Sequence, residues 1–213
     1  MSAPLVLYTH PMSRGRIARW MLEEVGQAYE ARILDFGPAM RAPDYLALNP
    51  MGKVPTLVHG EAVVTECAAI CAYLADAFPE AGLAPAPGDP SRGAYLRWLV
   101  FGAGPLEAAV TNQALGLTPP PERRGMVGYG SLEAVLDTLE GALARSPYLA
   151  GDRFTAADVY TGLQIAWGLA FGTIPKRAAF ETYAGRISAR PAAARARAID
   201  DALLAERQGA AGG

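Results

Sequence analysis

The sequence predicts an α+β N-terminal domain with a mixed four-stranded sheet, followed by an all-α helical bundle domain. Three observations predict this fold class. Short apolar segments alternate with helical patterns over the first third of the chain, in the order βαβ and then ββα. A segment dense in proline and glycine, PEAGLAPAPGDP, then interrupts the pattern, and the remainder of the chain lacks strand signals. We therefore expect a first domain at residues 1–80, a linker at 81–90 and a second domain at 91–213, with a flexible tail at 205–213.

The elements of the first domain follow from their residue patterns. The apolar segment Leu5–Thr9 predicts a strand, and Ser13–Val25 predicts a helix because Ile17, Met21 and Val25 recur at four-residue spacing. Further signals predict a second strand at Tyr29–Leu34, a short helix at Pro43–Leu48, a hairpin of Thr56–His59 and Ala62–Val64 around Gly60, and a helix from Glu66 to about Phe78.

Helical patterns fill the second domain. The expected helices are Ser91–Leu115, Glu122–Arg145, Ala156–Ala170, Pro175–Ala189 and Pro191–Glu206. The segment GDRFTAAD carries a capping signal, because Thr155 is a good N-cap and Asp158, three residues on, can reach back to the free N–H groups. Phe154 precedes this cap and can pack as a hydrophobic staple. These relationships favour a structural role for Asp158 over a catalytic one.

Bulk composition excludes several classes of protein. The 213-residue chain has a formal net charge of −2, so it lacks the basic footprint of a nucleic-acid-binding protein. Its longest apolar run, Cys67–Ala75, is shorter than the roughly 18–20 residues that a membrane span needs. The first residues lack a signal-peptide pattern, so we expect a cytoplasmic protein. Cys67 and Cys71 lie four apart on one helix face, and we interpret them as small buried residues rather than a redox pair.

Familiar catalytic motifs are missing from the sequence. There is no C-x-x-C pair, no glycine-rich phosphate loop and no G-x-S-x-G elbow. His10 and His59 are the only histidines, so a metal site has few candidate ligands. If the protein is an enzyme, its reactive group is therefore expected to come from the substrate.

Three segments nevertheless have features of a ligand site. Ser13 lies at a strand-to-helix turn, where it can be an ordinary helix cap or a functional hydroxyl. In MGKVPTL, Pro55 begins a strand. TECAAI opens a helix at Glu66, and the first N–H groups of a helix favour anions.

In this order, the three segments resemble the glutathione S-transferase family, over essentially the whole chain except its Gly/Ala tail. The resemblance implies a thioredoxin-like glutathione-binding domain followed by an all-helical domain. Val54 and Pro55 match a family pair with a cis-proline, in which the residue before proline pairs its backbone with the cysteinyl unit of glutathione. Glu66 matches the first residue of a Glu-Ser pair that holds the γ-glutamyl end. Cys67 replaces the serine, so the hydroxyl contact is lost.

The catalytic position stays open among three alternatives. Ungapped counting from the helix end places Ser13 on the serine of the serine-type classes, while the cysteine-type position falls on Arg14. Tyr8 is a rival, because some classes use a tyrosine near the end of the first strand. Arg14 or a backbone amide is the third candidate for stabilising the thiolate. The resemblance also implies that Lys53 holds the glycyl carboxylate, with a solvated lysine as the alternative.

The first half of the expected Ser13–Val25 helix carries an unusual charge cluster. Arg14, Arg16 and Arg19 lie near its N-terminus, where the helix dipole favours anions instead. We expect an incoming anion, such as glutathione, to compensate for them, with Arg14 facing the site and Arg16 on a different side of the helix. The alternative is that they are solvated surface residues.

The resemblance implies a glutathione transferase, with glutathione as co-substrate and no permanently bound cofactor. Its second substrate would be a hydrophobic electrophile, and a related glutathione-dependent reduction is the alternative reaction. The resemblance also implies a homodimer. Pro105 interrupts a predicted helix and can open a groove for the electrophile. The alternative function is a non-catalytic carrier or partner-binding protein of the same fold, to which Cys67 gives weight. Candidate walls of the electrophile pocket are Pro11, Met12, Trp98, Phe101, Trp167 and Phe171, and ordinary core packing is the alternative for each aromatic residue.

Overall fold

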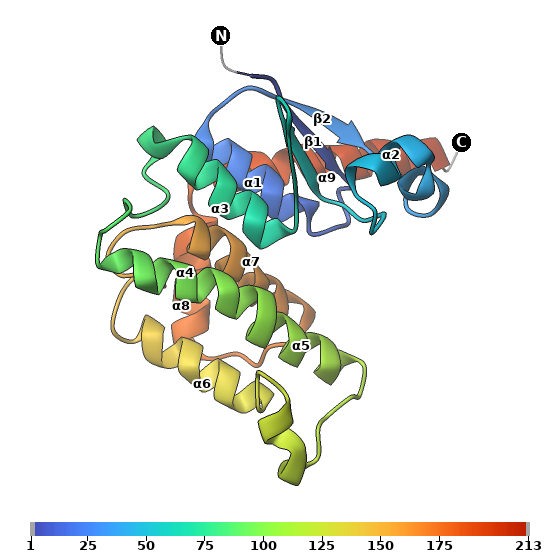
Figure 1. Cartoon of the computed structure of the whole chain (residues 1–213). Helices are drawn as coiled ribbons and strands as arrows, with labels where there is room; N and C mark the ends of the chain where they lie inside the picture. The colour runs from blue at the N-terminus through green and yellow to red at the C-terminus, as the bar shows by residue number, and fades with distance from the viewer. Residues whose placement is uncertain (1–2, 212–213) are drawn as a thin grey trace. The chain divides into compact units, whose positions relative to one another are not determined.

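A computed structural model of the chain describes residues 3–211 (Figure 1). The chain divides into two compact units, and each is described by itself. The N-terminal unit contains the residues up to Ala81 together with those from Ala189 onward, and the helical unit contains Gly82–Ser188. We expected residues 91–213 to form one domain, whereas the contacts group the last helix with the N-terminal unit.

A four-stranded mixed sheet forms the centre of the N-terminal unit, as predicted. The strand order is β2-β1-β3-β4, from β1 (Leu5–Thr9), β2 (Tyr29–Ile33), β3 (Thr56–His59) and β4 (Ala62–Thr65). β1 is parallel to β2 and antiparallel to β3, and β3 and β4 form the expected hairpin. Alternation along β1 buries Leu5, Leu7 and Thr9 on one face of the sheet.

Two helices pack side by side in this unit, α1 (Gly15–Val25) and α3 (Cys67–Ala77) (Figure 1). The predicted apolar stripe of α1 is confirmed, because Ile17, Met21 and Val25 are all buried. The short elements η1 (Pro38–Arg41) and α2 (Pro43–Leu48) connect β2 to β3, and η2 (Pro79–Ala81) follows α3.

The last helix, α9 (Pro191–Ala211), packs against α1. Its buried residues Ala192, Ala196 and Asp200 recur every four positions, so one narrow stripe faces the unit. We expected a helix only to Glu206 and an irregular tail after it. The helix instead continues to Ala211, and the final two residues of the expected tail lie outside the described residues.

The helical unit contains α4 (Ser91–Phe101), the π-helical segment η3 (Gly102–Leu106), α5 (Glu107–Ala114), η4 (Pro121–Met126), α6 (Leu132–Leu143), α7 (Ala156–Phe171) and α8 (Ala178–Ser188). α7 contacts both α4 and α8. The predicted helix over Ser91–Leu115 forms as the continuous run α4–η3–α5, with Pro105 inside the π-helical segment. No helix of residues 3–211 is long and apolar enough to cross a membrane.

The predicted helix Glu122–Arg145 forms only over its second half. Residues up to Met126 form the 3-10 segment η4, and α6 begins only at Leu132. The chain between them carries Gly130 at φ 65°, a left-handed conformation that a helix cannot accommodate. Ser131 then caps α6 by accepting a hydrogen bond from the Ala134 N–H at 3.1 Å.

The predicted capping box at the start of α7 is confirmed. Asp158 Oδ2 accepts hydrogen bonds from the backbone N–H of Thr155 at 2.9 Å and from its hydroxyl at 3.0 Å. Oδ1 accepts from the Leu149 N–H at 2.9 Å and from the Tyr183 hydroxyl at 2.8 Å. Burial raises the pKa of Asp158 even though these donors oppose the rise. The carboxylate joins three segments of the helical unit, which is a structural role.

Candidate functional site

The sheet register brings three separate segments to one end of the N-terminal unit. Tyr8 pairs with Thr56, and Thr56 pairs with Thr65. The turn that follows β1, the segment that precedes β3 and the residue that follows β4 therefore lie at the same end of the sheet. We call residues 10–15, 53–55 and 66–67 the sheet-end site. The Cys67 thiol donates to the Arg14 carbonyl at 3.3 Å and so links the starts of α3 and α1.

Ser13 occupies the turn between β1 and α1. Its hydroxyl donates to the His10 carbonyl at 2.7 Å, and its Oγ accepts the Gly15 N–H at 2.9 Å. Its backbone N–H also donates to the His10 carbonyl, at 3.0 Å. Ser13 is half-buried. It therefore closes the turn and binds the first N–H of α1, while the residue remains partly exposed.

Gly15 allows this turn to approach β1 closely. A Cβ at this position would lie 1.9 Å from Thr9 Oγ1 and 2.9 Å from Ser13 Oγ, so no other residue type fits without movement. The sequence analysis did not single out Gly15 or Thr9. The only signal was a glycine inside the first turn of a predicted helix, where glycine is unfavourable unless packing requires it.

The Val54–Pro55 peptide is cis, as the resemblance implied. Two buried side chains hold the segment before it. The Tyr45 hydroxyl and Asn49 Nδ2 both donate to the Lys53 carbonyl, at 2.5 and 2.7 Å. The Lys53 side chain itself is exposed. The sequence analysis missed Tyr45 and Asn49, although the Asn-Pro dipeptide that begins at Asn49 was a usable turn signal.

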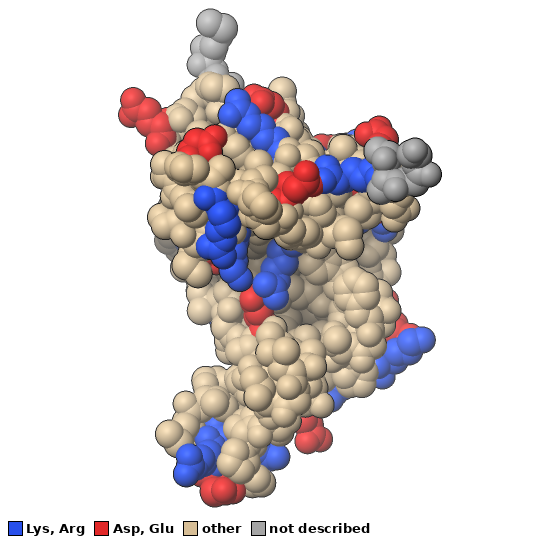
Figure 2. Space-filling model, turned by 90° about the vertical axis from the view of Figure 1, so that its right-hand side faces the viewer, with Lys and Arg blue, Asp and Glu red and all other residues tan. Residues whose placement is uncertain are grey.

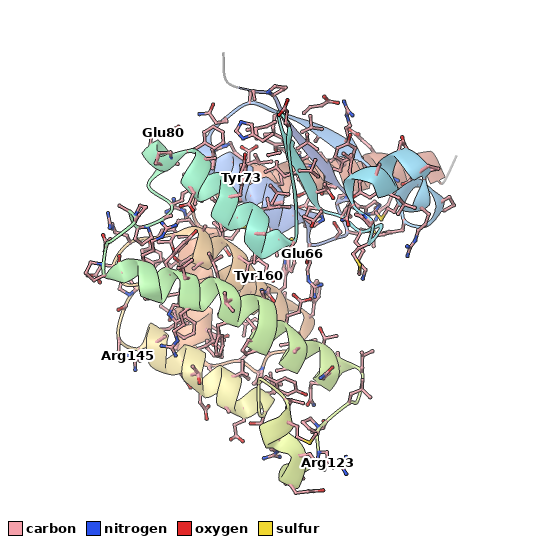
Figure 3. All side chains as sticks on the ribbon, viewed as in Figure 1. Glu66, Tyr73, Glu80, Arg123, Arg145 and Tyr160 are labelled. Carbon is pink, nitrogen blue, oxygen red and sulfur yellow. The ribbon has the colours of Figure 1, made fainter. Side chains whose placement is uncertain are left out.

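Glu66 adopts an unusual backbone conformation at the start of α3, where Figure 3 labels it. Its φ of 64° makes it the one non-glycine residue with positive φ in the part of the chain that the structure describes. Such a conformation costs free energy and is concentrated at functional sites. Strain and position together mark Glu66 as a candidate ligand-binding residue.

The two cysteines behave as small buried residues, as expected. Cys67 and Cys71 are both buried, and neither forms a disulfide. Burial, and secondarily the neighbouring Cys67, raise the pKa of the Cys71 thiol well above its usual value, so the reactive thiolate form is disfavoured.

The three N-terminal arginines of α1 have different environments. Arg16 Nε donates to the Pro11 carbonyl at 2.6 Å, and its Nη2 pairs with Asp201 at 2.7 Å. Arg19 is buried and pairs with Asp200 at 2.9 Å. The expectation that an incoming anion compensates all three is therefore wrong for Arg16 and Arg19, because α9 supplies their carboxylates.

Arg14 is the exposed member of this arginine cluster. It lies next to Ser13 in the sheet-end site. It therefore remains a candidate for contacting an anionic ligand.

Tyr8 lies on the other face of the sheet from the Ser13 turn. Its hydroxyl accepts a hydrogen bond from Arg32 at 2.8 Å, and its ring centroid is 5.5 Å from that of Tyr45. Successive residues of a strand point to opposite faces, and the next residue, Thr9, faces Gly15 of α1. The structure therefore does not bring the Tyr8 hydroxyl and Ser13 together.

The candidate walls of an electrophile pocket differ in exposure. Trp98 is buried in the helical unit at 3% exposure, with the ring centroid of Phe101 5.2 Å from its own. Trp167 is half-buried and Phe171 is 76% exposed. In the N-terminal unit, Pro11 is buried and Met12 is 72% exposed. Trp98 is thus a core residue of its unit. Among residues 3–211 no group of three or more His, Cys, Asp or Glu side chains is arranged to hold a metal ion.

Two family models match the chain. The model for the glutathione S-transferase N-terminal domain matches residues 3–76, and the model for the C-terminal domain matches residues 107–162. The first match contains the complete sheet-end site.

Individual relatives agree with these models. The chain is 35% identical over 205 residues to glutathione S-transferase 3 from Zea mays, covering 89% of this chain and 91% of the relative. A glutathione transferase structure from Methylococcus capsulatus is 32% identical with a TM-score of 0.76, over 92% and 98% of the two chains. A sphingomonad glutathione S-transferase, solved in complex with glutathione, is 29% identical with a TM-score of 0.73, over 92% and 98%.

Proposed function

The chain belongs to the glutathione S-transferase family and is a glutathione transferase, and on that premise we propose that its sheet-end site binds glutathione, with Ser13 stabilising the thiolate. The observation that carries the proposal is the register that places Ser13, cis-Pro55 and Glu66 at one end of the sheet. The complex of the sphingomonad relative with glutathione supports the choice of ligand.

The three segments suit different parts of glutathione. Val54 lies just before β3, outside the sheet ladder, so its backbone can pair with the extended cysteinyl unit. Glu66 supplies a carboxylate for the ammonium of the γ-glutamyl end. The free N–H groups at the start of α3 favour the carboxylate of the same γ-glutamyl end. Lys53 supplies an exposed ammonium for the glycyl carboxylate. The thiol then lies toward the Ser13 turn.

Only the thiolate of glutathione is a strong nucleophile, so the site must favour the charged form. A hydrogen bond to a charged group contributes about 1.5–3 kcal/mol. The Ser13 hydroxyl first gives up its bond to the His10 carbonyl, at a cost of about 1 kcal/mol. The start of α1 adds about 0.3–1 kcal/mol. The net preference, about 0.8–3 kcal/mol, lowers the thiol pKa by about 0.6–2 units.

The test is the ultraviolet absorbance of the thiolate in the glutathione complex, titrated against pH. Wild type is expected to titrate below free glutathione, and Ser13→Ala to return the pKa close to that of free glutathione. Ser131→Ala is the matched control, because it removes a serine that caps α6 in the helical unit. If Ser13→Ala titrates like wild type, Ser13 is only a turn residue, and Arg14 becomes the next candidate. If wild type does not bind glutathione, the proposed site is wrong.

We also propose the second substrate, the assembly and the cellular compartment, and family membership supports each proposal. The thiolate would attack a hydrophobic electrophile, forming a carbon–sulfur bond as the leaving group departs with the bonding electrons. We also infer a homodimer in the cytoplasm. Sedimentation of the purified protein tests the dimer, and conjugation of a series of apolar electrophiles of increasing size tests the substrate class.

A further inference from the structure

The C-terminal helix α9 is joined to the rest of the N-terminal unit by charged side chains. Figure 2 shows blue and red side chains lying next to one another at the upper end of the view. Ion pairs join α9, or Arg190 just before it, to the rest of the unit. They are Arg190–Glu24, Arg195–Glu23, Asp200–Arg19, Asp201–Arg16 and Arg207–Asp35. They extend along α1 from its last turn to its first and continue to the loop after β2.

One of these pairs also reaches the sheet-end site. Arg16 pairs with Asp201 through Nη2 at 2.7 Å and donates from Nε to the Pro11 carbonyl at 2.6 Å. Pro11 lies two residues before Ser13, within the turn that the Ser13 backbone N–H closes by donating to the His10 carbonyl. The guanidinium is rigid and planar, so a carboxylate that fixes the position of Nη2 also fixes the direction of the Nε–H bond.

We propose that Asp201 and Arg16 are positioning residues for the reaction: α9 holds the Arg16 guanidinium, which holds the Pro11 carbonyl and thereby the orientation of the Ser13 hydroxyl. This inference rests on the proposed function of the sheet-end site. Small displacements of a catalytic group reduce rates strongly, so a turn that lacks regular secondary structure benefits from such a support. The same contacts make α9 part of the catalytic apparatus although it contributes no group to the ligand.

Two positions of α9, Asp201 and Arg195, allow a matched comparison. Asp201→Ala removes the support of Arg16. Arg195→Ala removes a similar exposed ion pair, to Glu23 in the last turns of α1, and so weakens the attachment of α9 away from the turn. Asp201→Glu restores the carboxylate. Arg16→Lys keeps the charge, but lysine lacks the planar group whose Nε and Nη2 donate in fixed directions.

The first measurement is amide hydrogen exchange of Met12 and Ser13 in the ligand-free protein, which does not depend on glutathione. Their N–H groups bond to His10 within the turn. We expect Asp201→Ala and Arg16→Lys to accelerate this exchange about threefold to tenfold, and Arg195→Ala and Asp201→Glu to leave it within about twofold of wild type. Equal acceleration by Asp201→Ala and Arg195→Ala, or none by either, overturns the proposal.

The second measurement is the thiolate titration of bound glutathione. Asp201→Ala is expected to raise the thiolate pKa by about half a unit and to lower kcat more than it raises KM, whereas Arg195→Ala shifts neither. An unchanged titration in Asp201→Ala overturns the catalytic part of the proposal. If wild type itself fails to bind glutathione, the proposed function fails, and hydrogen exchange still decides whether α9 supports the turn.

Discussion

Arg19 and Asp200 form an ion pair between α1 and α9 in which the two side chains are only 2% and 1% exposed, with Nε 2.9 Å from Oδ1. Arg19 Nη2 and Asp200 Oδ2 have no hydrogen-bond partner within the described residues. Burial raises the pKa of Asp200 despite the neighbouring guanidinium. A buried ion pair whose polar atoms are only partly hydrogen-bonded adds little to the free energy of unfolding. Either charge left buried without the other lowers that free energy strongly.

Removal of one partner of the Arg19–Asp200 pair is therefore expected to lower the free energy of unfolding more than removal of both. Asp200→Asn should lower the free energy of unfolding by about 3–5 kcal/mol, because Arg19 is left buried and uncompensated. The double variant Arg19→Met, Asp200→Leu should recover most of this loss. Urea denaturation measures both effects.

The control for this comparison is an exposed ion pair. Asp137 pairs with Arg177 but is 61% exposed. Asp137→Asn is expected to cost less than about 1 kcal/mol. Similar losses from Asp137→Asn and Asp200→Asn would show that burial does not determine the contribution of the Arg19–Asp200 pair.

The close approach of the Ser13 turn to β1 predicts a sharp effect at Gly15. Gly15→Ala places a Cβ against Thr9 Oγ1 and should lower the free energy of unfolding by about 1–3 kcal/mol, because the turn has to move. Gly185→Ala in α8 meets no atom within 4 Å and should raise the free energy of unfolding by up to about 1 kcal/mol. Thermal and urea denaturation of the two variants provide the comparison. A stabilising Gly15→Ala would contradict the close approach.

The positive φ of Glu66 predicts opposite effects on stability and binding. Glu66→Gly removes the steric cost of φ 64° and is expected to raise the free energy of unfolding by about 1 kcal/mol. It also removes the proposed γ-glutamyl contact, so the Kd for glutathione should rise at least tenfold. Calorimetry and urea denaturation measure the two quantities.

Glu61→Gly is the control for Glu66→Gly, because Glu61 is an exposed residue of the β3–β4 turn without a positive φ. It is expected to lower stability and to leave glutathione binding unchanged. If Glu66→Gly keeps the wild-type Kd, Glu66 does not contact the ligand.

The environment of His10 predicts that the free energy of unfolding depends on pH. Its Nδ1 accepts the Met12 N–H at 3.1 Å, and burial, with a smaller contribution from the positive charge of Arg207, lowers the pKa of His10. The folded protein therefore favours the neutral ring. As the pH falls below about 6.5, the unfolded chain binds a proton before the folded one does, so the free energy of unfolding should decrease.

The measurement is urea denaturation at several pH values between about 7 and 5. His10→Asn keeps a hydrogen-bond acceptor near Nδ1 and is expected to reduce this dependence. His59→Gln is the control variant, because it replaces the other histidine and leaves the hydrogen bond between Met12 and His10 in place. An unchanged pH dependence in His10→Asn would mean that His10 is not the responsible group.

Local sequence patterns were sufficient wherever the deciding interactions lie within a few residues or repeat with a regular period. The stripe of Ile17, Met21 and Val25 predicted the buried face of α1, and the spacing of Thr155 and Asp158 predicted the capping box. Ser13, Val54–Pro55 and Glu66 were identified as parts of one site because their segments match a family motif. The register of β1, β3 and β4 is the physical reason that they meet.

The partners of these residues depended on the folded chain. Arg16 and Arg19 find their carboxylates 185 and 181 residues away, and no local pattern connects α1 with α9. The close contact of Thr9 with Gly15 likewise depends on how separate segments pack. The same is true of the hydrogen bonds that Tyr45 and Asn49 donate to the Lys53 carbonyl. Hydrophobic periodicity records which face of an element is buried, but it does not record which element covers that face. The charges that support the Ser13 turn are therefore decided only when α9 packs against α1.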